Sequence, residues 1–166
     1  MTDMLKNCQL CPRACGADRT KSRGACGAGV EIEAARASLH LWEEPPISGT
    51  NGSGTVFFSH CSLGCVFCQN RRISRREAEG QNITADALAK TFLSLEKKGA
   101  HNINLVTGAH YVPQIIEALQ IARKQGLSLP VVYNSSGYEQ VETLQLLDGH
   151  IDIYLPDYKY YSSYYA

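Results

Sequence analysis

From residue 55 onward, short apolar runs recur along the chain, each of a length that suits one strand. They cover residues 55–59, 102–107, 129–133 and 151–155 and are rich in β-branched and aromatic side chains. Such runs, bounded by Gly, Pro, Asn or Ser, are typical of buried strands. The pattern therefore predicts four strands.

Segments with helical periodicity separate these strands. After Thr84, a candidate N-cap, apolar side chains recur at spacings of three and four until Lys97-Lys98-Gly99. A second such segment begins at Val112-Pro113 and ends before Gly126, and a weaker one covers 139–147. The alternation of strand and helix predicts an α/β protein with a parallel sheet and right-handed crossovers.

Residues 31–49 alternate only weakly between apolar and polar positions and turn at Pro45-Pro46. The glycines of 49–54 precede a strand instead of opening a helix, so we interpret them as a turn and not as a phosphate loop. Trp42, Glu43 and Glu44 either face a substrate or are a packed aromatic ring beside two solvated carboxylates. We expect the second.

Polar side chains gather just after each predicted strand. They include a cysteine loop at 61–68, then Thr107 to His110, Asn134 to Ser136, and Asp157 with Lys159. The carboxyl ends of parallel strands share one edge of a sheet, where active sites of α/β proteins lie. We expect these residues to line one site, although a lone histidine such as His110 is more often structural.

Composition narrows the possible functions. Sixteen basic and sixteen acidic side chains cancel in 166 residues, which argues against a dedicated nucleic-acid or membrane-surface binder. We find no secretory signal and no apolar run that could cross a bilayer, so we expect a cytoplasmic protein. Seven cysteines in a reducing compartment indicate metal binding more than disulfides.

Cys61, Cys65 and Cys68 follow the first strand with C-x3-C-x2-C spacing. Thiolates prefer soft metals, so zinc or an iron–sulfur cluster is expected. No cysteine follows Cys68, so a four-iron cluster would keep one iron open to an outside molecule. Zinc with His60 as fourth ligand is the alternative, but adjacent side chains of an extended strand point to opposite faces.

Cys8, Cys11, Cys15 and Cys26 form a second group, in a segment with few large apolar side chains. Metal binding can supply folding energy to such a segment. The spacing suits a structural zinc or an auxiliary iron–sulfur cluster and does not choose between them.

The run Cys61-x3-Cys65-x-Phe67-Cys68 resembles the cluster motif of the radical S-adenosylmethionine (SAM) enzymes. With Asn70 it is similar to the form in pyruvate formate-lyase activating enzymes, and residues 8–15 and 41–49 resemble a less characterised, activating-enzyme-like branch. The resemblance implies a partial (βα) barrel. We expect residues 51–166 to form its N-terminal half, about three βα units plus a fourth strand, after a Cys-rich extension at 1–50.

The chain stops before such a barrel would be complete. It ends in a tail rich in tyrosine, with Tyr158, Tyr160, Tyr161, Tyr164 and Tyr165. We therefore expect a truncated chain or a fragment.

The resemblance also implies a mechanism. A 4Fe-4S cluster on Cys61, Cys65 and Cys68 binds the amino and carboxylate groups of SAM at its open iron. One electron then splits SAM into methionine and a 5′-deoxyadenosyl radical, which takes a hydrogen atom from the substrate. The expected SAM or substrate contacts are Phe67, Asn70, Thr107, Asn134, Ser136, Asp157 and Lys159.

Each contact has a plainer alternative: core packing for Phe67, a strand-end turn for Asn134 and Ser136, and a surface ion pair for Asp157 with Lys159. Thr107-Gly108-Ala109-His110 lacks the acid of the family's Gly-Gly-Glu motif, which leaves the contact to the SAM amine without its usual carboxylate.

A reduced flavodoxin or ferredoxin is the expected electron donor, and Arg71, Arg72, Arg75 and Arg76 form either its docking patch or a solvated face. The substrate class is open and includes a glycine of a partner protein. The competing interpretation is a metal-stapled scaffold or binding protein without catalysis.

Overall fold

The fold is that of a computed structural model, which describes residues 3–78, 80–159, 162 and 164. Tyr160, Tyr161 and Tyr165 of the predicted tyrosine-rich tail lie outside these residues. The helices are α1 (Asp3–Lys6), α2 (Pro45–Ser48), α3 (Arg71–Ser74), α4 (Ala85–Lys97), α5 (Val112–Lys124) and α6 (Val141–Leu146), with a 3-10 turn η1 (Ala109–Tyr111). The strands are β1 (Ile32–His40), β2 (Ser53–Phe58), β3 (Gln81–Ile83), β4 (Ile103–Val106), β5 (Val131–Ser135) and β6 (Ile153–Pro156).

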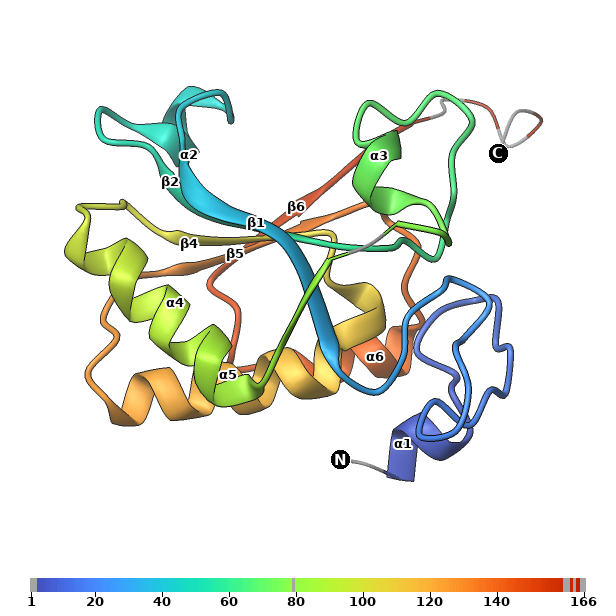
Figure 1. The fold of residues 1–166 in the computed structure, drawn as a ribbon. Coiled ribbons are helices and arrows are strands. Elements are labelled where there is room, and N and C mark those ends of the chain that lie inside the picture. Colours follow the sequence, from blue (N-terminus) through green and yellow to red (C-terminus); the bar gives the residue numbers. More distant parts are fainter. Residues whose placement is uncertain (1–2, 79, 160–161, 163, 165–166) are drawn as a thin grey trace.

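These strands form a single six-stranded sheet in the order β3-β1-β2-β4-β5-β6 (Figure 1). Four strands are parallel and lie side by side in the sheet in the order in which they occur in the sequence: β2, β4, β5 and β6. The alternation of strand and helix predicts this arrangement. β1 runs antiparallel to both β2 and β3. The chain is therefore a mixed α/β protein. The predicted partial barrel stays a prediction.

The four predicted strands and the helices α4, α5 and α6 are confirmed, with ends that shift by a few residues. β1 and β3 are not in the prediction. β1 lacks an apolar run because only its first residues are buried, and β3 is three residues long with two exposed polar side chains. β1 and β2 pair across residue 50, and the division of the chain at that point stays a prediction.

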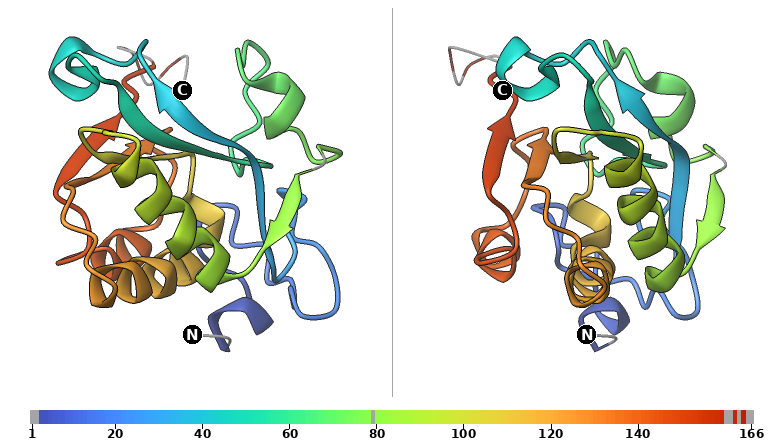
Figure 2. Two further views of the ribbon diagram at one scale, coloured as in Figure 1. Left: turned by 60° about the vertical axis from the view of Figure 1, so that its left-hand side comes forward. Right: turned by 90° about the vertical axis from the view of Figure 1, so that its left-hand side faces the viewer.

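One face of the sheet carries the hydrophobic core. α4, α5 and α6 all lie on this side, below the sheet in Figure 1 (see also Figure 2). The strand residues that point to it alternate along each strand. They include Val56, Phe58, Ile103, Leu105, Val131 and Tyr133, packed against Leu88 and Phe92 of α4 and Ile115 and Leu119 of α5.

The opposite face is left to the loops. The chain from β2 to α3 rises on that side, beside the carboxyl ends of the parallel strands (Figure 1). The helices and the hydrophobic core thus lie on one face of the sheet, and the cysteine loop lies over the other face.

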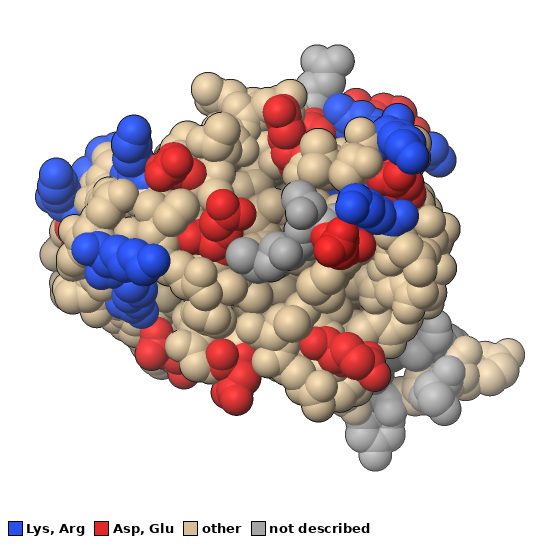
Figure 3. All heavy atoms as spheres, turned by 90° about the horizontal axis from the view of Figure 1, so that it is seen from below, with Lys and Arg blue, Asp and Glu red and all other residues tan. Residues whose placement is uncertain are grey.

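The outer face of the helix layer carries acidic and basic side chains together (Figure 3). This mixture matches the zero net charge of the chain. In the described part of the chain, no helix combines the length and the apolar run that a membrane span needs.

Candidate functional site

The cysteine loop starts where β2 ends. Ser59 still donates its N–H to Glu33 O of β1 (2.8 Å), and His60 then takes a left-handed conformation (φ 68°) that turns the chain away from the sheet. Gly64 turns it again at φ 71°, a region that favours glycine. All three cysteines of the loop are partly exposed.

The loop borders a cavity of about 1320 Å³ on the sheet face opposite the helices. All ten residues predicted to bind the cluster, SAM or substrate line it: Cys61, Cys65, Phe67, Cys68, Asn70, Thr107, Asn134, Ser136, Asp157 and Lys159. The structure therefore brings the predicted residues together, at the ends of all four parallel strands. Their roles remain predictions.

Several of these side chains are available to a ligand. Ser136 Oγ is buried without a hydrogen-bond partner among the described residues. Asn70 precedes α3 and makes no side-chain cap to it. Phe67 is 59% exposed, so core packing, the alternative interpretation of this residue, is wrong.

Asp157 and Lys159 form an ion pair at the rim of the cavity. The ion pair that the sequence predicts as the alternative role of these two residues is therefore present. Partial burial acts to lower the pKa of Lys159, but the bond to Asp157 and the charges of the Cys65 and Cys68 thiolates outweigh it and raise that pKa. A positive charge therefore faces two of the three candidate cluster ligands.

The cavity also contains Trp42, Glu43 and Glu44, for which contact with a substrate is the less favoured of the two interpretations from the sequence. Trp42 is 89% exposed and lines it, so the interpretation of Trp42 as a packed aromatic ring is wrong. Glu43 and Glu44 line it as well, and Glu43 accepts a hydrogen bond from Asn134 Nδ2 (3.3 Å).

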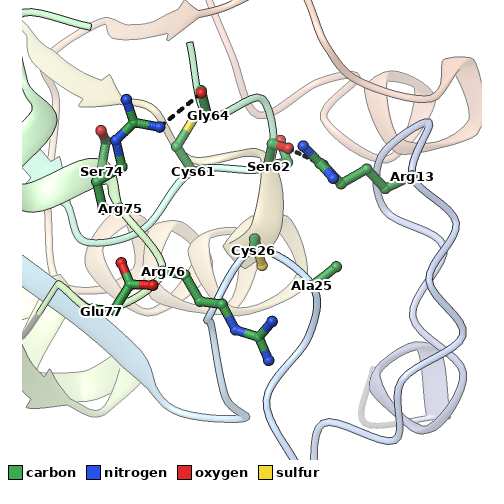
Figure 4. Close-up of a pocket in the computed structure, with 10 residues that line it drawn as sticks. All are labelled: Arg13, Ala25, Cys26, Cys61, Ser62, Gly64, Ser74, Arg75, Arg76 and Glu77. Atoms are coloured by element: carbon green, nitrogen blue, oxygen red, sulfur yellow. Dashed lines mark hydrogen bonds between the residues drawn. The ribbon is translucent and has the colours of Figure 1, made fainter. Parts of the chain in front are cut away.

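Two arginines hold the cysteine loop through its backbone. Arg13 Nε donates to Ser62 O (2.5 Å), and Arg75 donates to Gly64 O (2.8 Å) and Cys65 O (2.9 Å). Both side chains line a second, smaller cavity of about 240 Å³ together with Cys26 and Cys61 (Figure 4). Arg75 is thus engaged with the loop, whereas Arg71, Arg72 and Arg76 are exposed.

A buried polar network lies directly behind the loop. His60 Nε2 is 3.0 Å from Glu33 Oε2, and Arg23 Nη1 donates to Glu33 Oε1 (2.7 Å). A Cβ on Gly27 would lie 2.5 Å from Arg76 O, so glycine is required where the N-terminal segment passes the loop. His60 is occupied with Glu33 and is not placed as a fourth ligand beside Cys61.

The four N-terminal thiols are neighbours. Burial raises the pKa of Cys11 and of Cys26, and both thiols are also affected by the charge of Cys8. Burial opposes ionisation of Cys15, but backbone N–H groups of Ala25 and Ala17 outweigh it and lower the pKa.

In the residues that the structure describes, no three Cys, His, Asp or Glu side chains converge closely enough to hold one metal ion. A zinc ion needs its ligands at ~2.3 Å from a single point, so this finding gives zinc no support at either cysteine group. A four-iron cluster binds each thiolate through a different iron and tolerates a wider spacing. Three partly exposed thiols around an open cavity fit such a cluster.

Comparison with known proteins agrees with the chemistry of this cavity. The model of the Radical SAM superfamily matches residues 55–162, from β2 to beyond β6. An uncharacterised protein of Methanocaldococcus jannaschii is 31% identical over 163 residues, which is 95% of this chain and 47% of that protein. The chain thus spans about half the length of the curated relative that it matches. The superfamily match, which covers more than half of the chain, shows that the chain belongs to the radical SAM superfamily.

Proposed function

We propose that the cavity binds a 4Fe-4S cluster on Cys61, Cys65 and Cys68 together with SAM, for hydrogen-atom abstraction from a substrate. The observation that carries this proposal is that the three thiols and the polar ends of all four parallel strands line one cavity. When bound and reduced, the cluster supplies the electron that cleaves SAM to methionine and a 5′-deoxyadenosyl radical.

The chain's own residues supply binding and electrostatics. Three thiolates would hold three irons of the cluster and leave the fourth without a protein ligand. Lys159, which is paired with Asp157, lies within electrostatic reach of Cys65 and Cys68. Ser136 Oγ, which has no hydrogen-bond partner among the described residues, and the half-buried Thr107 and Asn134 offer hydrogen bonds to SAM or to the substrate. Phe67 offers an exposed aromatic face at the rim.

The finer assignment is an activating-enzyme-like activity on a partner protein. It rests on the C-x3-C-x2-C-x-N spacing and on the position of Asn70 in the cavity wall. Radical SAM enzymes usually take electrons from flavodoxin or ferredoxin, and the exposed Arg71, Arg72 and Arg76 offer a basic surface for such an acidic donor.

We extend the proposal to Cys8, Cys11, Cys15 and Cys26 as a second metal site, supported by the electrostatic coupling of these thiols. An auxiliary iron–sulfur cluster is favoured over zinc, because the thiols do not converge on one point. A scaffold without catalysis is not favoured, since the superfamily match covers the cysteine loop and the ends of the four parallel strands that line the cavity.

Anaerobic reconstitution tests the proposal. We expect about four irons at the cysteine loop and an EPR signal of the reduced protein that SAM changes. Cys65→Ala removes the SAM-responsive signal. Cys15→Ser, in the N-terminal group outside the cavity, is the matched control and keeps it. Reconstituted protein whose EPR signal ignores SAM would contradict the proposal, and a SAM response lost in Cys15→Ser would place the open iron elsewhere.

A further inference from the structure

Asn104 is a buried polar side chain on the same face of the sheet as Val106, which lines the cavity. Ile103 and Leu105 point into the helix-side core, so Asn104 and Val106 point to the other face of the sheet, and Val106 lines the cavity. Asn104 is fully buried, yet neither Nδ2 nor Oδ1 has a hydrogen-bond partner among the described residues. A buried amide without partners costs about 1–3 kcal/mol, which indicates that it is kept for a ligand.

Glu43 brings a carboxylate to the same place. Its Oε2 accepts from Asn134 Nδ2. The Asn104 amide lies close enough to favour the charged form of Glu43 as a hydrogen-bond donor would, but no bond of good geometry joins the two side chains. Burial is the main cause that raises the pKa of Glu43, and His40 opposes it. No Lys, Arg or His side chain forms an ion pair with Glu43 in the described ranges.

The backbone that carries Glu43 is held in place. Its N–H donates to Ser48 Oγ (3.0 Å), and the Ser48 hydroxyl lies 3.2 Å from Glu43 O. Ser48 is buried, and its own N–H donates to Glu44 O at the start of α2. A half-buried carboxylate that is fixed in position and has no cationic partner among the described residues is typical of a binding site.

The chemistry of the three side chains selects one kind of ligand group. Asn134 uses Nδ2 for Glu43, which leaves its Oδ1 free to accept, and Asn104 Oδ1 and the Glu43 carboxylate accept as well. Three acceptors, one of them negatively charged, match the three N–H donors and the charge of a primary ammonium group. An anionic group would meet the Glu43 carboxylate and be repelled.

We propose that Glu43, Asn104 and Asn134 form a subsite that binds a primary ammonium group of the substrate. The ammonium group of SAM is a second source of the same chemistry. The substrate is favoured because Glu43 follows β1, whose last residue, His40, pairs with Ser53 at the start of β2. Glu43 therefore enters the cavity from the edge opposite the cysteine loop. That the ligand is the enzyme's substrate rests on the proposed function, whereas binding of an ammonium group at this subsite does not.

NMR of the side-chain amides of Asn104 and Asn134 tests the subsite in the full chain without a cluster. The probes are n-butylammonium, tetramethylammonium, which has the charge but no N–H, and the neutral 1-butanol. We expect saturable shifts with n-butylammonium alone. Glu43→Gln weakens its binding about tenfold or more, equivalent to ~1.4 kcal/mol, whereas Glu117→Gln, at an exposed carboxylate of α5 that does not line the cavity, leaves it unchanged.

Three results would overturn the subsite: no saturable shift, equal shifts with tetramethylammonium, or binding that Glu43→Gln does not weaken. A further result would assign the ammonium group to SAM instead of the substrate. In that case Glu43→Gln lowers the SAM affinity of the reconstituted protein, and n-butylammonium does not bind. A missing SAM response in EPR would contradict the proposed function alone, since the amine titration needs no cluster.

Thermal unfolding gives a second measurement that does not depend on finding a ligand. If the Asn104 amide is kept for binding, Asn104→Leu removes an unsatisfied buried polar group and raises the unfolding midpoint. If the amide is structural, the same change lowers the midpoint, and that result would count against the subsite.

Discussion

His110 illustrates how burial decides the role of a single side chain. It follows β4 near the cavity but is 2% exposed, and its Nε2 lies 2.8 Å from Ser59 O. Burial lowers its pKa to about 3, so the imidazole is neutral and Nε2 carries the proton that it donates to Ser59. His110 thus supports the end of β2, as expected of a structural histidine, and does not line the cavity.

This burial makes stability depend on pH. Between the ordinary value of 6.5 and about 3, the unfolded chain binds a proton at His110 and the folded chain does not. The free energy of unfolding therefore falls as the pH falls through this window, by up to about 1.4 kcal/mol per pH unit from this group. Denaturant unfolding between pH 7 and 4.5, compared with His110→Gln, checks it. Equal pH slopes for the two proteins would contradict the assignment.

The sequence predicts those site residues that directly follow a strand. Cys61, Thr107, Asn134 and Asp157 follow apolar runs, so their common location can be inferred. Asn104 sits inside such a run, and only the pairing of β4 shows which face it points to.

The backbone of the cysteine loop depends on side chains from two other elements. Arg13 comes from the N-terminal segment and Arg75 directly follows α3, and each donates to carbonyl oxygens between Ser62 and Cys65. These contacts fix the loop before any ligand binds. Charged donors also make stronger hydrogen bonds than neutral ones, so two arginines can hold a loop with no regular secondary structure.

Arg75→Gln is expected to loosen this loop locally. Loss of the two charge-assisted bonds to Gly64 O and Cys65 O lowers the free energy of local opening, and amide hydrogen exchange at residues 62–68 becomes about tenfold faster or more. Arg72→Gln, an exposed neighbour on α3, is the control and leaves exchange unchanged. Equal protection of the loop in both variants would show that Arg75 does not hold it.

Elements with a strong apolar pattern are predictable, and those that face the cavity are less so. α4 and α5 each bury one stripe against the sheet, and the sequence spacing of that stripe reveals them. Most side chains of β1 are only partly buried, so the strand contains Ala, Arg and Ser and shows a weak hydrophobic pattern. It nevertheless pairs with β2 along nearly its whole length. Pairing with a neighbouring strand, and not its own sequence, makes it a strand.

At the scale of the whole molecule, the N-terminal segment is joined to the sheet by a buried charge. Arg19 is 2% exposed and donates to Gly29 O (2.9 Å through Nε) and to His110 O. Its guanidinium lies 5.4 Å from the centre of the Tyr111 ring. In the described part of the chain no carboxylate pairs with it, so carbonyl dipoles and the ring compensate the charge.

This arrangement predicts that the N-terminal segment and the sheet unfold together. Arg19→Met leaves the carbonyl groups of Gly29 and His110 without their charged donor. At ~1.5 kcal/mol for each of these two carbonyl acceptors, the lost stability amounts to about 3 kcal/mol. The loss should appear in a single transition, followed in parallel by far-UV circular dichroism and by labelling of the buried Cys8 thiol.

Lys21→Met is the matched control, because Lys21 lies two residues away with a side chain that is 81% exposed, and it should not move the transition. If Arg19→Met releases Cys8 to labelling well before the sheet unfolds, the segment is a separate unit tethered by Arg19. If neither signal shifts, the buried arginine adds nothing to stability. A shared shift of both signals means that the sheet is stabilised by the same segment that supplies Arg13 to the cysteine loop. In that case the geometry of the candidate cluster site depends on residues outside the matched superfamily region.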